Sequence, residues 1–224
     1  MSIPGKLPSG ADYAPPVSDL DILHLDPHVI AVAKPHGLLS VPGKEPWLAD
    51  CLEARVRAAF PDALLLHRLD MDTSGVMIFA RTRLAQRHLY WQFERRQLSK
   101  TYEARVWGVP DGDEGTIDLP LVCDWPRRPL QKVCHETGKP ARTRWRKLSA
   151  EKGTSRMQLI PETGRSHQLR VHMLALGHPI LGDRFYAQGD ALAAAHRLML
   201  HASNLRFRHP DGGAWMSVDA PVPF

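Results

Sequence analysis

A short run of polar residues, 67–74, carries the side chains with the clearest chemical potential in this sequence. It contains an imidazole, a guanidinium and two carboxylates, and Asp70 lies near its centre. Apolar runs at 64–66 and 76–80 enclose it, and short apolar runs bounded by turn residues are typical of buried strands. The polar run is therefore predicted to be a loop held between two strands, a common place for catalytic residues.

Spacing alone leaves two interpretations of this loop open. Asp70, Asp72 and Thr73 are residue types that form turns through hydrogen bonds from side chain to backbone. The same three residues match the D-x-D-x-T pattern of Mg²⁺-dependent aspartyl phosphotransferases. That second interpretation requires a doubly wound parallel sheet and a later acidic pair, for which Asp183 and Asp190 are poor substitutes.

A second group of polar residues lies within 161–183, where the spacing predicts a helix. Ser166 is the expected cap at its beginning and Gly177 the residue at which it ends. Its expected buried stripe consists of Leu169, Met173 and Leu176.

The expected beginning of this helix contains three basic side chains that would lie close together, those of Arg165, His167 and Arg170. His167 and His172 could be considered as a metal pair, but a spacing of five residues places them well apart around a helix. Because no cysteine or acid completes the set, we expect no metal site.

The remaining pattern predicts two more helices and many strands. One helix spans 46–60, and another begins at the cap residue Thr82, with outward arginines that suit either solvent or phosphate groups. A strand is expected at 29–33, and Lys34 at its end is expected to be solvated. The other expected strands are 100–106, 116–122, 141–148, 155–160, 198–201, 205–208 and 216–218.

This many strands with so few helices predicts an α+β fold built on a large mixed, mostly antiparallel sheet that a few helices flank. The alternation of polar and apolar residues in most strands supports antiparallel pairing. Such a sheet disfavours the phosphotransferase interpretation, since that class has a doubly wound parallel sheet.

The composition describes a basic globular protein. The 224 residues include 43% hydrophobic and 24% charged residues, with a net charge of +5 and a pI near 9.3. A basic balance fits a protein that meets polyanions such as RNA. Three cysteines at no metal-ligand spacing indicate neither a disulfide framework nor a zinc site. With no apolar segment long enough for a membrane span, we expect a cytoplasmic protein.

Residues 1–18 are rich in Pro, Gly and Ser, and we expect them to form a flexible leader or one that lies along the surface. Residues 19–224 are expected to form a single catalytic domain. No heptad or repeat indicates an oligomer, so we expect a monomer.

Several runs resemble signatures of the RluA family of RNA pseudouridine synthases. They are H-R-L-D at 67–70 with T-S-G at 73–75, K-T-Y at 100–102, T-G-R-S-H-Q-L-R-V-H at 163–172 and G-H-P-I-L-G-D at 177–183. The resemblance implies the pseudouridine-synthase fold, with an active-site cleft across the sheet. It implies no cofactor, and we expect no S4-type RNA-binding domain, which many relatives carry in front of the catalytic domain.

The resemblance also implies roles for individual residues. Asp70 would be the nucleophile, Tyr102 the aromatic partner of the target base, and Arg165 the arginine that pairs with the aspartate. Leu200 would line the uridine pocket. Arg68 would occupy the space of the flipped base, although a salt bridge to a neighbouring aspartate is an equal alternative.

Further RNA contacts are expected from residues of the same motifs and from the basic segment at 127–132. These residues are His67, Thr73, His167, Arg170, Arg127, Arg128 and Lys132. Basic side chains there would attract the RNA backbone with little base selectivity. The segment 119–141 and the short N-terminus resemble the branch of the family that modifies both 23S rRNA and tRNA anticodon stem-loops, so these RNAs are the expected partners.

Overall fold

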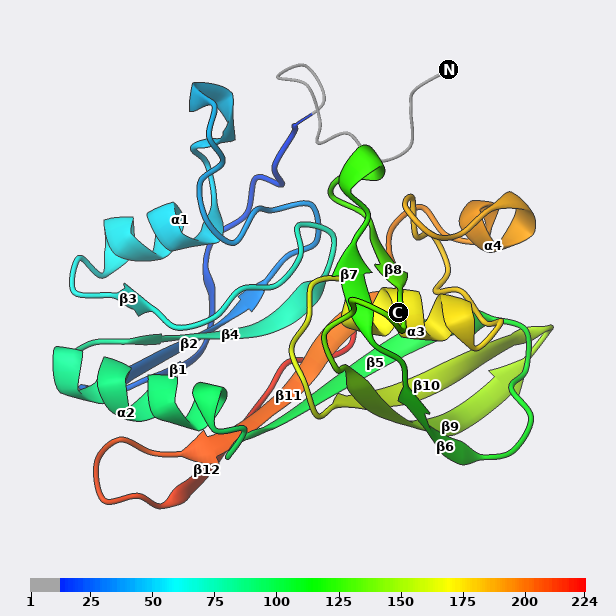
Figure 1. The fold of residues 1–224 in the computed structure, drawn as a ribbon. Helices are drawn as coiled ribbons and strands as arrows, with labels where there is room; N and C mark the ends of the chain where they lie inside the picture. The colour runs from blue at the N-terminus through cyan, green and yellow to red at the C-terminus, as the bar shows by residue number, and fades with distance from the viewer. Residues whose placement is uncertain (1–12) are drawn as a thin grey trace. The chain divides into compact units, whose positions relative to one another are not determined.

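The computed structural model describes residues 13–224 (Figure 1). The contacts of these residues group into two compact units. The first unit consists of residues 13–100 and 201–223, and the second of residues 101–200 with Phe224. Each unit is described by itself. Residues 1–12, most of the expected leader, lie outside the described residues, and the expectation of a single domain over 19–224 stays a prediction.

The first unit is a sheet with a helix on each face. Its strands are β1 (Asp21–Leu25), β2 (Val29–Lys34), β3 (Leu64–Leu65), β4 (Ser74–Ala80), β11 (Leu200–Arg208) and β12 (Trp215–Asp219). β2 pairs antiparallel with β1 and β4, β3 pairs antiparallel with β4, and β12 pairs antiparallel with β11. β4 and β11 run parallel, with Ser74 opposite His201.

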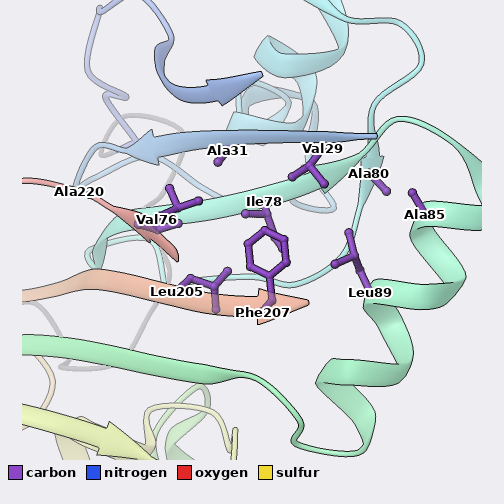
Figure 2. Close-up of a cluster of buried hydrophobic side chains, with 11 residues drawn as sticks. Val29, Ala31, Val76, Ile78, Ala80, Ala85, Leu89, Leu205, Phe207 and Ala220 are labelled. Atoms are coloured by element: carbon purple, nitrogen blue, oxygen red, sulfur yellow. The ribbon is translucent and has the colours of Figure 1, made fainter. Parts of the chain in front are cut away.

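Strand alternation divides the core of this unit between the two faces. Val29 and Ala31 of β2 face the core that α2 (Arg83–Glu94) covers, where Ile78, Leu89 and Phe207 meet (Figure 2). Ile30 and Val32, which alternate with these two along β2, face a second core on the opposite side of the sheet. The helix α1 (Leu52–Ala59) contributes Leu52 and Val56 to that core. β4 is buried along its whole length, because it contributes side chains to both cores.

The predicted helix at 46–60 is wrong in its extent. A short 3₁₀ turn, η1 (Pro46–Leu48), is followed by α1, which begins only at Leu52. Cys51 interrupts the two because its backbone is extended, with φ −156° and ψ 166°, and its Sγ accepts a hydrogen bond from the Ala54 N–H at 3.4 Å. The predicted cap of α2 is confirmed, since Thr82 Oγ1 accepts from the Ala85 N–H at 3.1 Å.

The second unit contains a four-stranded antiparallel sheet and a two-stranded one. In order of pairing, the larger sheet contains β5 (Ser99–Trp107), β10 (Thr154–Pro161), β9 (Arg142–Glu151) and β6 (Glu114–Asp118). The smaller sheet is the hairpin of β7 (Leu121–Cys123) and β8 (Gln131–Val133), with η2 (Trp125–Arg127) at its tip. Its helices are α3 (Gln168–Ala175) and α4 (Gly189–Ala193).

Two strand boundaries differ from the sequence prediction. The expected strand at 116–122 is divided between β6 and β7, which belong to different sheets. The two strands expected at 198–201 and 205–208 form one strand, because β11 continues through the polar residues between them. The α+β class with mixed, mostly antiparallel pairing is confirmed.

α3 is more deeply buried than the predicted stripe requires. Leu169 and Met173 pack into the core beneath the larger sheet of the second unit, as expected. Gln168, Arg170 and His172 are buried as well, so polar side chains of this helix must find partners inside the protein. Among residues 13–224, no helix has the length and apolar character needed to cross a bilayer.

Candidate active site

Asp70 lies in the loop between β3 and β4, in the first unit. It is half-buried, and its carbonyl accepts a hydrogen bond from the Thr73 N–H at 3.1 Å, which closes a tight turn. Arg68 is exposed two residues earlier. The turn interpretation is thus correct for the backbone, and it presents a carboxylate and a guanidinium on neighbouring positions of the same loop.

Lys34 supports this loop from within, which corrects the expectation of a solvated lysine. Its side chain is 1% exposed, and Nζ donates to the carbonyls of Pro35, Leu38 and Met71 at 2.9, 2.7 and 2.8 Å. The Met71 carbonyl also accepts from the Gly37 N–H at 2.9 Å. Because Met71 directly follows Asp70, the ammonium fixes the backbone beside the carboxylate.

Ser40 holds the loop on the other side of Asp70. Its hydroxyl donates to the Leu69 carbonyl at 2.6 Å, and the Leu69 N–H donates back to Oγ at 3.1 Å. Both residues that flank Asp70 in sequence are therefore bound through their backbones to the segment 34–40.

The end of the loop is attached to β11. His201 Nε2 lies 3.2 Å from the carbonyl of Ala220, which can only accept, so Nε2 carries the proton. Nδ1 then accepts from the hydroxyl of Ser74 at 2.8 Å. Gly75 follows with φ +117°, and a Cβ there would lie 2.2 Å from the Ala202 carbonyl oxygen. Only glycine permits this approach.

His67 and Thr73 serve the structure of the loop, which speaks against the expected direct RNA contacts. His67 stacks on Phe93 at 4.7 Å between ring centroids, and its Nε2 accepts from the Ile78 N–H at 3.1 Å. Burial, with a smaller effect of the nearby Lys100, lowers the pKa of His67 to about 3. The imidazole is therefore neutral and carries no charge that could attract a phosphate. Thr73 is buried, so its side chain is not accessible to RNA.

Tyr102 and Leu200 belong to the core of the second unit. Tyr102 lies on β5 opposite Leu159 and is half-buried against a cluster in which Leu200 is itself buried. Tyr102 is therefore partly exposed, whereas Leu200 belongs to the buried core, and its place in a uridine pocket stays a prediction.

Arg165 is positioned by Gln168, a residue that the sequence analysis did not single out. The Gln168 carboxamide is 3% exposed; its oxygen accepts from the Arg165 N–H at 3.0 Å and from the Thr163 hydroxyl at 2.6 Å. Its nitrogen donates to the Arg142 carbonyl and to Thr143 Oγ1, each at 3.0 Å. Arg165 Nε donates to the Pro140 carbonyl at 3.1 Å.

The beginning of α3 differs from the predicted cap at Ser166. The cap residue is His167, whose backbone is left-handed with φ 53° and whose side chain caps no backbone N–H. Its Nδ1 lies 2.7 Å from the hydroxyl of Tyr186, which accepts from the Gln131 N–H at 2.9 Å. His167 therefore connects the helix to the β7–β8 hairpin through Tyr186.

Arg170 is also a structural residue, and its burial corrects the expectation of an RNA contact. The side chain is 2% exposed and forms a two-pronged pair with Asp183, with Nε–Oδ2 at 2.8 Å and Nη2–Oδ1 at 2.6 Å. The guanidinium lies over the rings of Phe185 and Tyr186. The pair fixes the G-D motif at 182–183 against the T-G-R-S-H-Q-L-R motif.

The β7–β8 hairpin carries the expected basic residues on its surface. Arg127 and Lys132 are exposed and both pair with the buried carboxylate of Asp124, Arg127 Nε at 2.7 Å and Lys132 Nζ at 3.7 Å. Arg128 stacks on the exposed ring of Trp125 at 4.2 Å. These cations can approach a phosphate backbone. Within residues 13–224, no group of His, Cys, Asp or Glu is arranged to hold a metal ion.

Comparison with known proteins identifies the family. The sequence model described as RNA pseudouridylate synthase matches residues 28–175. This chain belongs to that family. A protein named dual-specificity RNA pseudouridine synthase RluA from Escherichia coli K12 is 54% identical over 95% of this chain and 98% of its own length. A protein of the same name from Vibrio vulnificus is 50% identical over 95% of this chain and 88% of its own length.

Solved structures agree on the fold. Human RNA pseudouridylate synthase domain containing 1 superimposes with a TM-score of 0.77 at 30% identity, covering 94% of this chain and 87% of its own. The human domain-containing 4 protein gives a TM-score of 0.74 at 26% identity, covering 91% and 88%. The chain is thus an RNA pseudouridine synthase, an isomerase that acts on RNA. The joint catalytic action of Asp70, in the first unit, with Tyr102 and Arg165, in the second, stays a prediction.

Proposed function

We propose that this enzyme converts uridines of both 23S rRNA and a tRNA anticodon stem-loop to pseudouridine, with Asp70 as the nucleophile. The observation that carries the proposal is the near full-length match to relatives named as dual-specificity enzymes. The loop geometry adds support, because Lys34 and Ser40 hold the backbone on both sides of Asp70. A preorganised carboxylate is what this reaction requires.

The chemistry suits a carboxylate. The reaction breaks the C1′–N1 glycosidic bond of uridine, turns the uracil and joins C1′ to C5, with no redox change and no net hydrolysis. A carboxylate can stabilise positive charge at C1′ or attack there, as in glycosidases. Addition at C6 and removal of a sugar proton to give a glycal are two other uses of Asp70. None of the three routes requires a metal or cofactor.

Tyr102 and Arg165 would complete the site. The guanidinium would keep the nucleophile ionised and oriented, since an opposite charge favours the charged form of a carboxyl group. The ring of the half-buried Tyr102 would cover the uracil face, and its hydroxyl would help to remove the C5 proton after rejoining. Leu200 would form the aliphatic side of the pocket.

Arg68 would assist base flipping. The target base must leave its stack before Asp70 can reach C1′, at a cost of about a few kcal/mol that is smaller in loops than in duplex. Arg68 is exposed on the same loop as the nucleophile, so it can fill the vacated space or stack on neighbouring bases. We further propose that the enzyme works as a cytoplasmic monomer.

A tritium-release assay tests the proposal. RNA that carries [5-³H]uridine, either a 23S rRNA fragment or an anticodon stem-loop, is incubated with wild type, Asp70→Asn or Asp72→Asn. We expect the wild type to release tritium from both RNAs and Asp70→Asn to release none while it still binds RNA within a few-fold. Asp72→Asn, two positions away in the same loop, should keep activity within about tenfold, because it leaves the proposed nucleophile intact.

Three results would contradict the proposal in different ways. Turnover by Asp70→Asn would exclude the nucleophile. Release from only one RNA class would exclude dual specificity. Equal loss in both variants would show that the assay reports damage to the loop and not removal of a nucleophile, and the assignment of Asp70 would then fail.

A further inference from the structure

The second unit contains a pocket of about 740 Å³ that the proposed chemistry does not use. It lies among the β7–β8 hairpin, the outer face of α3 and the segment that leads into α4; these elements are labelled in Figure 1. None of the residues assigned to uridine chemistry lines it. A pocket of this size is large enough for a nucleotide.

The interior of this pocket offers apolar and aromatic surface. Trp107 and Leu174 line it and remain 37% and 41% exposed. Phe185 and Tyr186 form another part of the wall, and the Arg170 guanidinium lies over both rings, at 4.9 and 5.2 Å from their centroids. Exposed apolar surface in a concave site indicates a binding partner. The rings are held in place before any partner arrives.

The charged residues of the pocket are of two kinds. Arg127 and Lys132 share the buried carboxylate of Asp124 but keep most of their side chains accessible to solvent. Cations that are anchored yet accessible suit a phosphate. Asp190, which also lines the pocket, is exposed. A carboxylate can only accept hydrogen bonds, so it suits a base with an exocyclic amino group.

We propose that this pocket binds one unpaired nucleobase of the RNA substrate, distinct from the target uridine and bearing an exocyclic amino group. The base lies on the aromatic and apolar wall, its amino group donates to Asp190, and its phosphate lies against Arg127 and Lys132. The inference rests on the proposed function for its ligand, since it assumes that the RNA substrate reaches the hairpin. The occupant follows from the combination of cations, aromatic wall and acceptor in one pocket.

The first test scans the substrate for the base that enters the pocket. An anticodon stem-loop with single-stranded extensions at both ends receives one abasic site at a time, at every unpaired position except the target uridine. Kd is measured by filter binding for the wild type, for Ala175→Trp and for Ala58→Trp. Ala175 is an exposed residue of α3 that lines the pocket, so its indole fills the space; Ala58 is an exposed residue of α1 and serves as the matched control.

We expect one abasic position to weaken wild-type binding by about tenfold or more, the usual effect of losing one base from an aromatic platform. The same abasic site should weaken Ala58→Trp equally and leave Ala175→Trp unchanged, because the filled pocket no longer holds the base. A scan in which no position behaves in this way overturns the proposal.

The second test addresses base identity. At the position found, adenine, cytosine, guanine and uracil are compared with the wild type and with Asp190→Asn. The wild type should bind uracil several-fold more weakly than the amino-bearing bases, and Asp190→Asn should reduce this difference to within about twofold, since an amide can also donate. If the wild type and Asp190→Asn discriminate against uracil to the same extent, Asp190 does not contact the base. Kd does not depend on turnover, so absence of tritium release would contradict the proposed function alone.

Discussion

At the scale of single residues, Lys34 shows how a side chain of ordinary appearance can hold the loop that carries the proposed nucleophile. A lysine at the end of a strand is usually solvated, because burying an ammonium is costly. Here three backbone carbonyls compensate for that cost, and one of them belongs to Met71 beside Asp70. The charge is therefore used to organise a loop.

Replacement of Lys34 by methionine tests this role. Lys34→Met keeps the length of the side chain but leaves buried carbonyls without their donor, which should lower the free energy of unfolding by about 3 kcal/mol. kcat should fall with it, because the backbone beside Asp70 loses a support. Urea unfolding and tritium release measure the two effects. Lys44→Met at an exposed position is the control, and a Lys34→Met variant as stable as that control would refute the argument.

The structural roles of individual residues could be predicted from the sequence only where they depend on residues nearby in the chain. The Asp70 loop and the cap at Thr82 depend on neighbours in sequence, and both were expected. The roles of Lys34, His67 and Arg170 depend on partners brought in by tertiary packing, such as Met71, 37 residues from Lys34. Residue type and position suggested solvent for Lys34, and the motif resemblance suggested RNA contacts for the other two.

At the scale of elements, the beginning of α3 depends on an internal amide in place of the usual cap. Gln168 uses both hydrogen-bonding atoms of its side chain, and one bond goes to the backbone of Arg165. The preceding His167 has a left-handed backbone. The T-G-R-S-H-Q motif is thus a turn fixed from inside the protein, and spacing rules for caps could not identify it.

Gln168→Leu should therefore affect catalysis through Arg165. The variant loses four hydrogen bonds in the interior, and we expect kcat to fall at least about tenfold while KM changes little, since misplacement of a catalytic group acts on the chemical step. Kinetics are compared at equal concentrations of folded protein. Gln97→Leu, at an exposed position after α2, is the control. An unchanged kcat in folded Gln168→Leu would contradict the positioning role.

The turn between β1 and β2 is a second element with a measurable charge dependence. Asp26 accepts from His24 Nε2 at 2.6 Å and from His209 Nε2 at 3.0 Å, and the latter joins this turn to the β11–β12 hairpin. Burial by itself would raise the pKa of Asp26 and lower the pKa of His209. Hydrogen bonds from His24, from backbone N–H groups and from His209 nevertheless lower the pKa of Asp26, and bonds to the Asp211 carbonyl and to Asp26 raise the pKa of His209.

These shifts define a pH window for stability. The contribution of Asp26 is present above its unfolded pKa of about 3.8 and is lost as the pH falls. The contribution of protonated His209 is complete below its unfolded pKa of about 6.5 and is lost as the pH rises through the raised folded value. Asp26→Asn should therefore lower Tm more at pH 5.5 than at pH 9. An equal decrease at both values would show that the imidazolium contributes nothing.

At the scale of the whole molecule, a net charge of +5 and an exposed basic hairpin predict RNA binding that depends strongly on salt. Neutralising both tip arginines, in the Arg127→Gln/Arg128→Gln variant, should reduce the slope of log Kd against log salt by about 0.7–0.9 for each lost phosphate contact. Filter binding over a range of salt concentrations measures it. Lys152→Gln, an exposed lysine paired with Glu151, is the control. If the double variant keeps the wild-type slope, the two arginines of the hairpin do not contact RNA phosphates.

The fold class could be predicted because alternation in many short segments is a local signal. The pairing of those segments is not local. β11 comes from the C-terminal part of the chain, yet it lies parallel to β4, and no pattern in either strand indicates the other. For the same reason the division of the described residues into two units was not foreseen, since the first unit takes residues from both ends of the sequence.

The attachment of Ser74 to His201 has a consequence for timing during synthesis. The two residues are 127 positions apart, and a ribosome adds about 5–20 residues per second. The nascent chain therefore exposes the Asp70 loop for roughly ten seconds before its partner on β11 has been made. An enzyme that we propose to modify ribosomal RNA thus remains unfinished, with the loop of its proposed nucleophile unsupported on one side, for most of the time it spends attached to the ribosome that makes it.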